Sequence, residues 1–278
     1  MSTEKQVVRA TTEAFLDRHP VFIRSMFANA HGERRPSSAL VKRLKYLQAT
    51  RRVVSLERGL YATVRSGADP KAVSPDPYLV ASVLRPNGVF GYHSALTLLG
   101  AAHSTWNVVT VLSHRRRRPL VLRTARVEVL PHPAQLVRRG TTDLGVRNVP
   151  YLETGLRVTG PERTLVDGFR QLRLVGGLEE FVTSAAGLAS LDFELLYSVL
   201  RAYDVRVLYA AVGWFLETYR QHFFVPDAFL TRLEEKRPAA PQYLPRRTRT
   251  ERESGRLVSR WNLILPEAVL RGAEPDEP

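Results

Sequence analysis

Two kinds of side chain in this sequence are candidates for chemistry, and the first is a pair of carboxylates. Glu162 and Asp167, in the segment ERTLVD, would suit general acid and base catalysis if both faced one substrate. A structural interpretation competes with this one, because a helix start favours a proline such as Pro161 and a negative charge, and Arg163 and Asp167 are spaced to share a helix face. We therefore interpret Glu162, Arg163 and Asp167 as a motif of the fold, with Arg163 and Asp167 as a stabilising pair or part of a partner-binding surface.

The second kind is clustered arginine, as in the segment RRVVSLERGLYATVR, residues 51–65. Two short apolar runs flank Glu-Arg-Gly, and Gly59 supplies the positive φ that a tight hairpin turn needs. Arg51, Arg52 and Arg58 then stand at the end and tip of a two-stranded hairpin. Guanidinium groups in these places suit contacts with DNA phosphates or the minor groove.

The elements before this hairpin complete a recognisable order. Apolar spacing predicts helices over 7–18, 21–29 and 36–49, the last capped by Pro36-Ser37-Ser38 and buried through Leu40, Leu44 and Leu47. Helix, helix, turn, helix and hairpin is the order of a winged helix-turn-helix, whose third helix enters the major groove. The residues expected to contact DNA are Ser37, Ser38, Val41, Lys42, Lys45, Arg51, Arg52 and Arg58.

The remainder of the chain contains apolar patterns typical of helices and apolar patterns typical of strands. Apolar patterns predict two short helices, four strands of a small sheet and five further helices. The helices are expected at 78–84, 94–99, 161–172, 178–188, 193–203, 205–219 and 227–236, and the strands at 108–112, 120–123, 127–130 and 156–158. The fold class is therefore α+β, an N-terminal winged helix-turn-helix followed by a mixed α/β domain with a small sheet and a helical C-terminal half.

Composition shifts divide the chain into three parts. The Gly, Ser, Asp and Pro of SGADPKAVSPDP mark a boundary, so residues 1–68 are expected to form the DNA-binding domain and residues 69–236 the second domain. Residues 237–278 form an Arg/Pro-rich tail, in which 237–256 is expected to be extended or mobile. Apolar residues near 257–270 are expected to dock on the domain body.

Charge favours a polyanionic partner for the first half. The 278 residues carry a net charge of +14, and residues 1–68 hold 13 Lys and Arg against five Asp and Glu. The arginine run Arg115, Arg116, Arg117 and Arg118 lies between two predicted strands. It is either a solvated loop or an additional contact with nucleic acid or an acidic partner.

Several classes of protein are disfavoured. The chain has no cysteine for disulfides or thiolate sites, no apolar run near the ~20 residues of a membrane span, and no secretory leader pattern at its start. We expect a cytoplasmic protein with no membrane partner. His93 and His103 are too sparse for a metal site, and no cofactor motif is present, so neither a metal nor a cofactor is expected.

Three segments in order resemble the AbiEi family of bacterial antitoxins. They are Arg58-Gly59-Leu60-Tyr61-Ala62, the block GVFGYHSALTLLG at 88–100, and the block TGPERTLVD at 159–167. The resemblance implies a type IV antitoxin and transcriptional autorepressor. Its partners would be the double-stranded operator DNA of its own operon, with inverted repeats, and a cognate nucleotidyltransferase toxin that it counters without a need for direct binding.

Two other classes of function compete with this one. The first is an enzyme, either a nuclease or a kinase or transferase that acts on the toxin, but the sequence has no GxxxxGK[ST], no GxGxxG before a helix and no HRD-type loop. The second is a ligand-responsive regulator, and no glycine-rich or cofactor motif in the second half supports it. A DNA-binding antitoxin without enzymatic activity is the favoured interpretation.

Overall fold

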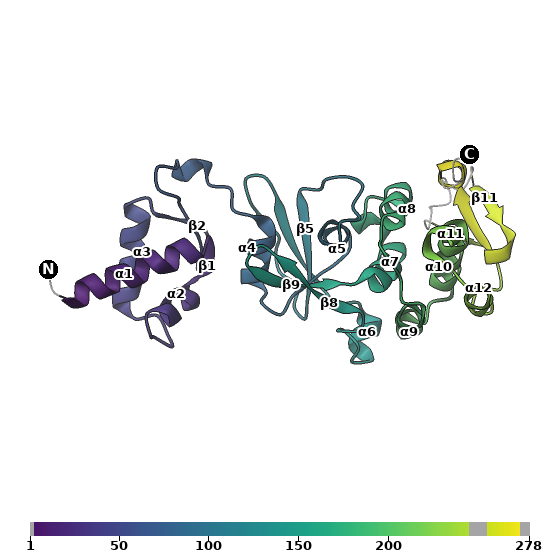
Figure 1. Cartoon of the computed structure of the whole chain (residues 1–278), viewed down its shortest axis with the longest axis horizontal. Helices are drawn as coiled ribbons and strands as arrows, with labels where there is room; N and C mark the ends of the chain where they lie inside the picture. The colour runs from purple at the N-terminus through teal and green to yellow at the C-terminus, as the bar shows by residue number, and fades with distance from the viewer. Residues whose placement is uncertain (1–2, 245–254, 273–278) are drawn as a thin grey trace. The chain divides into compact units, whose positions relative to one another are not determined.

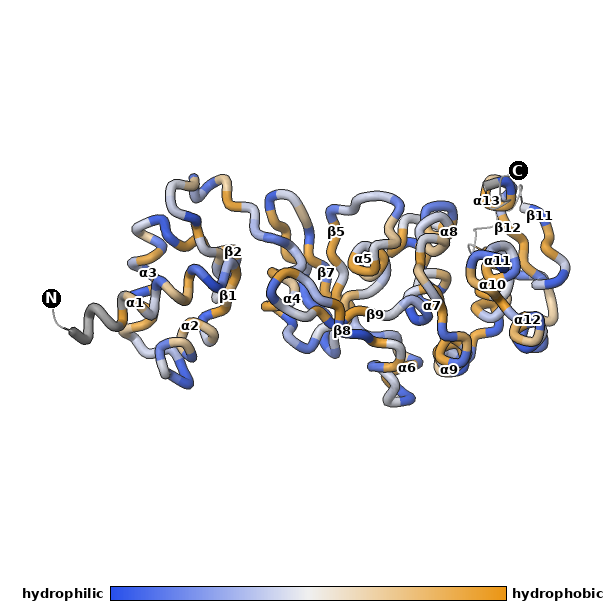
Figure 2. The backbone as a smooth tube through the Cα atoms, viewed as in Figure 1, coloured by the Kyte–Doolittle hydropathy of each residue, from blue (hydrophilic) through white to orange (hydrophobic). Residues whose placement is uncertain are grey.

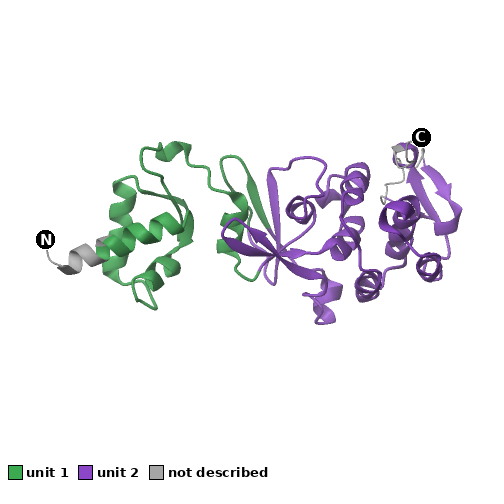
Figure 3. Ribbon diagram, in the orientation of Figure 1, with its two compact units in different colours: residues 1–87, 118–128 green, residues 88–117, 129–278 purple. Residues whose placement is uncertain are grey.

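The structure, a computed structural model, describes residues 3–244 and 255–272, with backbone alone at residues 3–7, 9 and 272. Contacts divide the chain into two compact units (Figure 3). Residues 1–87 with 118–128 form the first unit, and residues 88–117 with 129–278 form the second. Helices and three sheets are both present, which confirms the α+β class. The functional boundaries expected at residues 68 and 236 stay predictions.

The first unit begins with three helices and a three-stranded antiparallel sheet of order β1-β3-β2 (Figure 1). In chain order the elements are α1 (Thr3–Arg18), β1 (Val21–Ile23), α2 (Arg24–Ala30), α3 (Ser38–Ala49), β2 (Val53–Glu57) and β3 (Leu60–Thr63). The expected helix over 21–29 is wrong at its start, because Val21–Ile23 is a strand. These residues follow Pro20, two of them are β-branched, and Val21 pairs with Ala62 of β3.

Aromatic rings fill the core of this part. The ring centroids of Phe15 and Phe22 lie 5.1 Å apart in an edge-to-face arrangement, and Phe22 stacks on Tyr61 at 5.5 Å. Leu44 belongs to the same buried cluster, and Leu60 is also buried. The hairpin β2–β3 is therefore anchored to the core that it shares with the helices through Tyr61, and a two-stranded hairpin needs such packing for stability.

The first unit also contains the segment after the hairpin and residues 118–128. Its elements are η1 (Pro70–Ala72), α4 (Pro77–Leu84), β6 (Leu120–Val121) and the start of β7 (Arg126–Pro131). The carboxylate of Asp76 caps α4 by accepting hydrogen bonds from two backbone N–H groups of its first turn. The Ser74 and Thr124 hydroxyls lie 2.7 Å apart, so the turn between β6 and β7 holds the segment at residue 74.

The larger sheet has the strand order β6-β7-β5-β4-β9-β8. Its remaining strands are β4 (Val89–Phe90), β5 (Val108–Ser113), β8 (Val146–Tyr151) and β9 (Thr154–Thr159), with α5 (His93–Leu98) and α6 (Ala134–Arg138) in the connections. Neither β4 nor β8 was predicted. The first has only two residues, and the second has no buried residue, so neither shows the alternation of a half-buried strand.

The helical half of the second unit packs around one long buried helix, α10. Its elements are α7 (Pro161–Arg170), η2 (Leu172–Leu174), α8 (Leu178–Ala186), α9 (Phe193–Tyr203), α10 (Arg206–Thr218), α11 (Arg220–Phe223) and α12 (Asp227–Glu234). Every residue from 208 to 216 is buried. A helix that is apolar on all faces must be covered on all faces, and the neighbouring helices and the C-terminal segment supply that cover.

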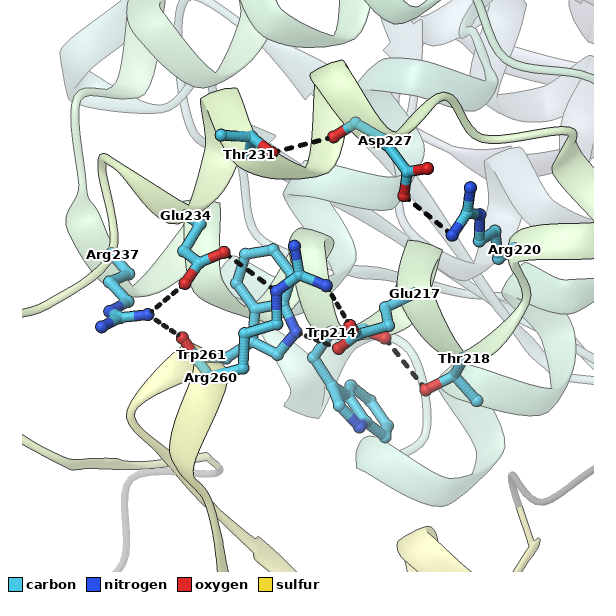
Figure 4. A network of polar contacts seen from close by, with 10 residues as sticks. All are labelled: Trp214, Glu217, Thr218, Arg220, Asp227, Thr231, Glu234, Arg237, Arg260 and Trp261. Atoms are coloured by element: carbon cyan, nitrogen blue, oxygen red, sulfur yellow. Dashed lines mark hydrogen bonds and ion pairs between the residues drawn. The ribbon is translucent and has the colours of Figure 1, made fainter.

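The C-terminal segment forms a third, three-stranded sheet. Its elements are β10 (Gln242–Tyr243), β11 (Gly255–Val258), η4 (Ser259–Trp261), β12 (Leu263–Pro266) and α13 (Glu267–Gly272). Figure 4 shows the side chains that fix it: the indole Nε1 of Trp261 donates to Glu217 at 2.6 Å, and Arg260 donates to Glu217 and Glu234. Trp261 is fully buried, whereas the expected extended stretch 237–256 lies in part, at 245–254, outside the described residues.

Candidate DNA-binding surface and antitoxin domain

The helix α3 presents two exposed lysines on the face opposite its core. Leu40, Leu44 and Leu47 are buried, whereas Lys42 and Lys45 are exposed. These lysines therefore lie where a helix inserted into a DNA groove would carry its cations.

Three further residues at the start of α3 were also expected to contact DNA. Ser38 is exposed and Val41 is half-buried. The hydroxyl of Ser37 is committed to the helix, because it accepts from the backbone N–H of Leu40 at 3.2 Å and donates to Glu33 at 2.9 Å. Ser37 thus sets the start of α3 in this structure.

The hairpin places its three arginines in different surroundings. Arg58 is exposed at the turn, where Gly59 has φ +87°. Arg51 is exposed and takes φ +58°, an uncommon backbone conformation for a residue with a side chain. Arg52 instead donates a hydrogen bond from each terminal nitrogen to the carboxylate of Glu13 in α1. These hydrogen bonds raise the pKa of Arg52.

Exposed residues that were not expected to contact DNA lie beside this set. Tyr46 of α3 is 66% exposed, next to Lys45, and the turn between α2 and α3 adds exposed Arg34 and Arg35. Figure 2 shows this turn as strongly hydrophilic. The signal for Tyr46 was its position, because it follows Lys45 on the side away from the leucine stripe and has no core to fill.

The block TGPERTLVD forms the end of β9 and the start of α7, and its charged residues are buried. Glu162, Arg163 and Asp167 have no exposed surface. The Nε of Arg163 lies 3.3 Å from Oδ2 of Asp167, and its Nη1 donates to the backbone carbonyls of Thr142 and Leu144 at 2.6 and 3.0 Å. Arg163 thus ties α7 to the loop before β8.

Asp167 is the centre of a buried polar network. The hydroxyl of Tyr203 donates to Asp167, and the Nε of Arg170 lies 4.0 Å from the same carboxylate. Arg170 in turn donates to the hydroxyl of Tyr92, and burial raises the pKa of Tyr92 to about 12. Burial also raises the pKa of Tyr203, so both phenols are protonated at neutral pH.

Glu162 stands at the N-terminal end of α7 and is held from two sides. It accepts a hydrogen bond from Arg147 of β8 at 2.9 Å and another from the backbone N–H of Asp192 at 2.9 Å. A carboxylate with no exposed surface and with its oxygens bonded within the fold has no access to a substrate. The geometry of Glu162 and Asp167 is therefore that of structural groups rather than of a catalytic pair.

The arginine run between β5 and β6 lies on the surface. Arg115, Arg116 and Arg118 are exposed, and Arg117 is half-buried with its backbone N–H donating to Val129 at 3.4 Å. The role of the run stays a prediction. Among the described residues no group of three or more His, Asp or Glu side chains is arranged to hold a metal ion. In the same part of the chain, none of the helices is both long and apolar enough to cross a bilayer.

Comparisons with known proteins find a similar solved structure and a matching family model. No curated protein sequence matches the chain. The crystal structure of the RV2827C protein from Mycobacterium tuberculosis is similar in fold, with a TM-score of 0.60 and 18% identity over 95% of this chain and 92% of that one. Residues 87–217 match the model of the AbiEi antitoxin C-terminal domain. They include the buried Arg163 and Asp167 network, and the match supports the predicted resemblance to AbiEi-family antitoxins over this domain.

Proposed function

We propose that this antitoxin is also a DNA-binding autorepressor, with residues 1–68 acting as a winged helix-turn-helix. The observation that carries the proposal is the exposure of Lys42 and Lys45 on α3, opposite its buried leucines, with Arg58 exposed at the hairpin tip. In this arrangement α3 enters the major groove and the hairpin β2–β3 lies along the backbone. The two lysines supply charge to phosphates, and Ser38 and Val41 face base edges.

We further propose that the toxin is a nucleotidyltransferase and that the second unit is responsible for countering it. The support is the family of the domain at residues 87–217. An enzymatic role in neutralisation has less support, because the acids of the block TGPERTLVD are buried and bonded within the fold. The antitoxin therefore acts in this proposal as a binding and regulatory protein in the cytoplasm.

The test of DNA binding is fluorescence anisotropy with the upstream region of the protein's own operon. The variant Lys42→Ala/Lys45→Ala should bind at least tenfold more weakly, because two phosphate contacts are lost. Lys236→Ala removes one exposed lysine of the second unit and should bind like the wild type. Unchanged affinity of the double variant would remove the winged helix-turn-helix from the proposal.

The test of the toxin is co-expression with the neighbouring gene product. The double lysine variant should still restore growth while it fails to repress a reporter under the operon's promoter, because the two activities lie in different units. Loss of both activities in a variant that folds like the wild type would contradict this separation.

A further inference from the structure

The second unit contains a pocket beside the buried network of Asp167. Its volume is about 520 Å³, and it lies among α6, the end of α7, the start of α10 and β10. Its lining is formed by Gln135, Phe169, Arg170, Gln171, Leu172, Val205, Val207, Leu208, Gln242, Tyr243 and Leu244. This lining contains one arginine and no acidic side chain. A pocket with an apolar wall and a few polar groups is typical of a small-molecule site.

The charge of Arg170 is not balanced by its surroundings. Arg163 and Arg170 share the single carboxylate of Asp167, and the two tyrosines of the network, Tyr92 and Tyr203, are neutral. The network therefore holds one positive charge in excess. Arg170 is shielded from water over most of its side chain, and its Nε is buried without a hydrogen-bond acceptor among the described residues. An anion in the pocket would supply the missing negative charge.

The groups around Arg170 suit the uncharged part of an organic anion. The amides of Gln135, Gln171 and Gln242 offer uncharged hydrogen-bond donors and acceptors. Phe169, Leu172 and Leu208 give the pocket apolar lining. Val205, the residue before α10, makes no side-chain cap for this helix.

We propose that this pocket binds a small organic anion, a carboxylate or a phosphate monoester with an apolar body, and that Arg170 binds its charged group. The site lies wholly within the second unit, so the proposal does not depend on DNA binding by the first. It makes the antitoxin domain a receptor for a metabolite-sized ligand.

The experiment is isothermal titration calorimetry of the full chain with three probes of one size: phenyl phosphate, phenylacetate and uncharged benzyl alcohol. At least one anionic probe should bind saturably, and whichever binds more tightly identifies the charged group as phosphate or carboxylate. Benzyl alcohol should bind at least tenfold more weakly than that anion, because it has no charge for Arg170. Equal affinity for benzyl alcohol, or no saturable binding of either anion, would overturn the proposal.

Two variants test the site itself. Arg170→Gln should weaken binding of the anion at least tenfold, whereas Arg173→Gln, which removes an exposed arginine of the neighbouring η2, should leave it unchanged. Because Arg170 also contacts Tyr92, a second variant, Val207→Trp, fills the pocket and leaves the polar network in place. Full affinity in Val207→Trp would show that the anion binds elsewhere and would reject the pocket.

Discussion

Arg163 and Asp167 lie one helical turn apart on α7, with the Nε of Arg163 3.3 Å from Oδ2 of Asp167 and neither side chain exposed. The contribution of this ion pair to stability depends on its neighbours, because Asp167 also accepts a hydrogen bond from Tyr203 and lies near Arg170. Removal of one partner from a buried ion pair leaves an uncompensated charge, which costs far more than the pair itself contributes. The network therefore makes the family block TGPERTLVD sensitive to substitution.

Asp167→Ala should lower the free energy of unfolding of the second unit by about 3–5 kcal/mol, because two buried arginines lose their shared carboxylate. Urea denaturation followed by circular dichroism measures the loss. The matched control is Asp143→Ala, which breaks the ion pair of Asp143, 73% exposed, with Arg157 and should cost less than about 1 kcal/mol. Similar losses in the two variants would show that Asp167 is not the centre of a buried network.

Glu13 should limit the contribution of Arg52 to DNA binding, because it holds the guanidinium on α1. If Lys42, Lys45, Arg51 and Arg58 make the phosphate contacts, log affinity should fall with log salt with a slope of roughly −3.6. Glu13→Gln should release Arg52, tighten binding and steepen the slope by about 0.9. Anisotropy titrations at several salt concentrations measure both. A slope that stays the same in Glu13→Gln would mean that Arg52 does not reach DNA.

His132 should make the second unit less stable in acid. Burial, and after it the charge of Arg163, lowers the pKa of His132 from 6.5 to about 4. The neutral form therefore contributes stability that is present above pH 6.5 and is lost as the pH falls toward 4, by about 3 kcal/mol. His132→Gln should show a smaller drop in melting temperature between pH 7 and pH 4 than the wild type. His222→Gln, at an exposed histidine, should keep the full drop.

Gly213 should be required for docking of the C-terminal segment. A Cβ at this position would lie 2.1 Å from the ring of Trp261, which is fully buried against α10. Gly213→Ala should therefore cost about 1–3 kcal/mol by overpacking, although alanine favours a helix. Limited trypsin digestion should cleave after Arg256 or Arg260 faster than in the wild type. Thr218→Ala, also on α10, should digest like the wild type.

Local sequence signals predicted much of the first unit. Ser37 caps α3, Leu40, Leu44 and Leu47 are its buried stripe, and Gly59 turns the hairpin, because caps, apolar spacing and turn glycines act over a few residues. These local signals do not reveal which distant residue a side chain contacts. The residues expected to contact DNA therefore included Arg52 as well as Arg58, although only the tertiary structure shows that Arg52 is paired with Glu13.

The sequence by itself determined most of the helices and the β2–β3 hairpin, the excess of positive charge in the first half and the motifs of the antitoxin domain. The tertiary structure decided the strand at Val21, the burial of Glu162 and Asp167, and the charge left on Arg170. Each of these depends on groups far apart in the chain. Strand pairing, desolvation and charge balance are properties of the packed neighbourhood, and no local period or spacing encodes them.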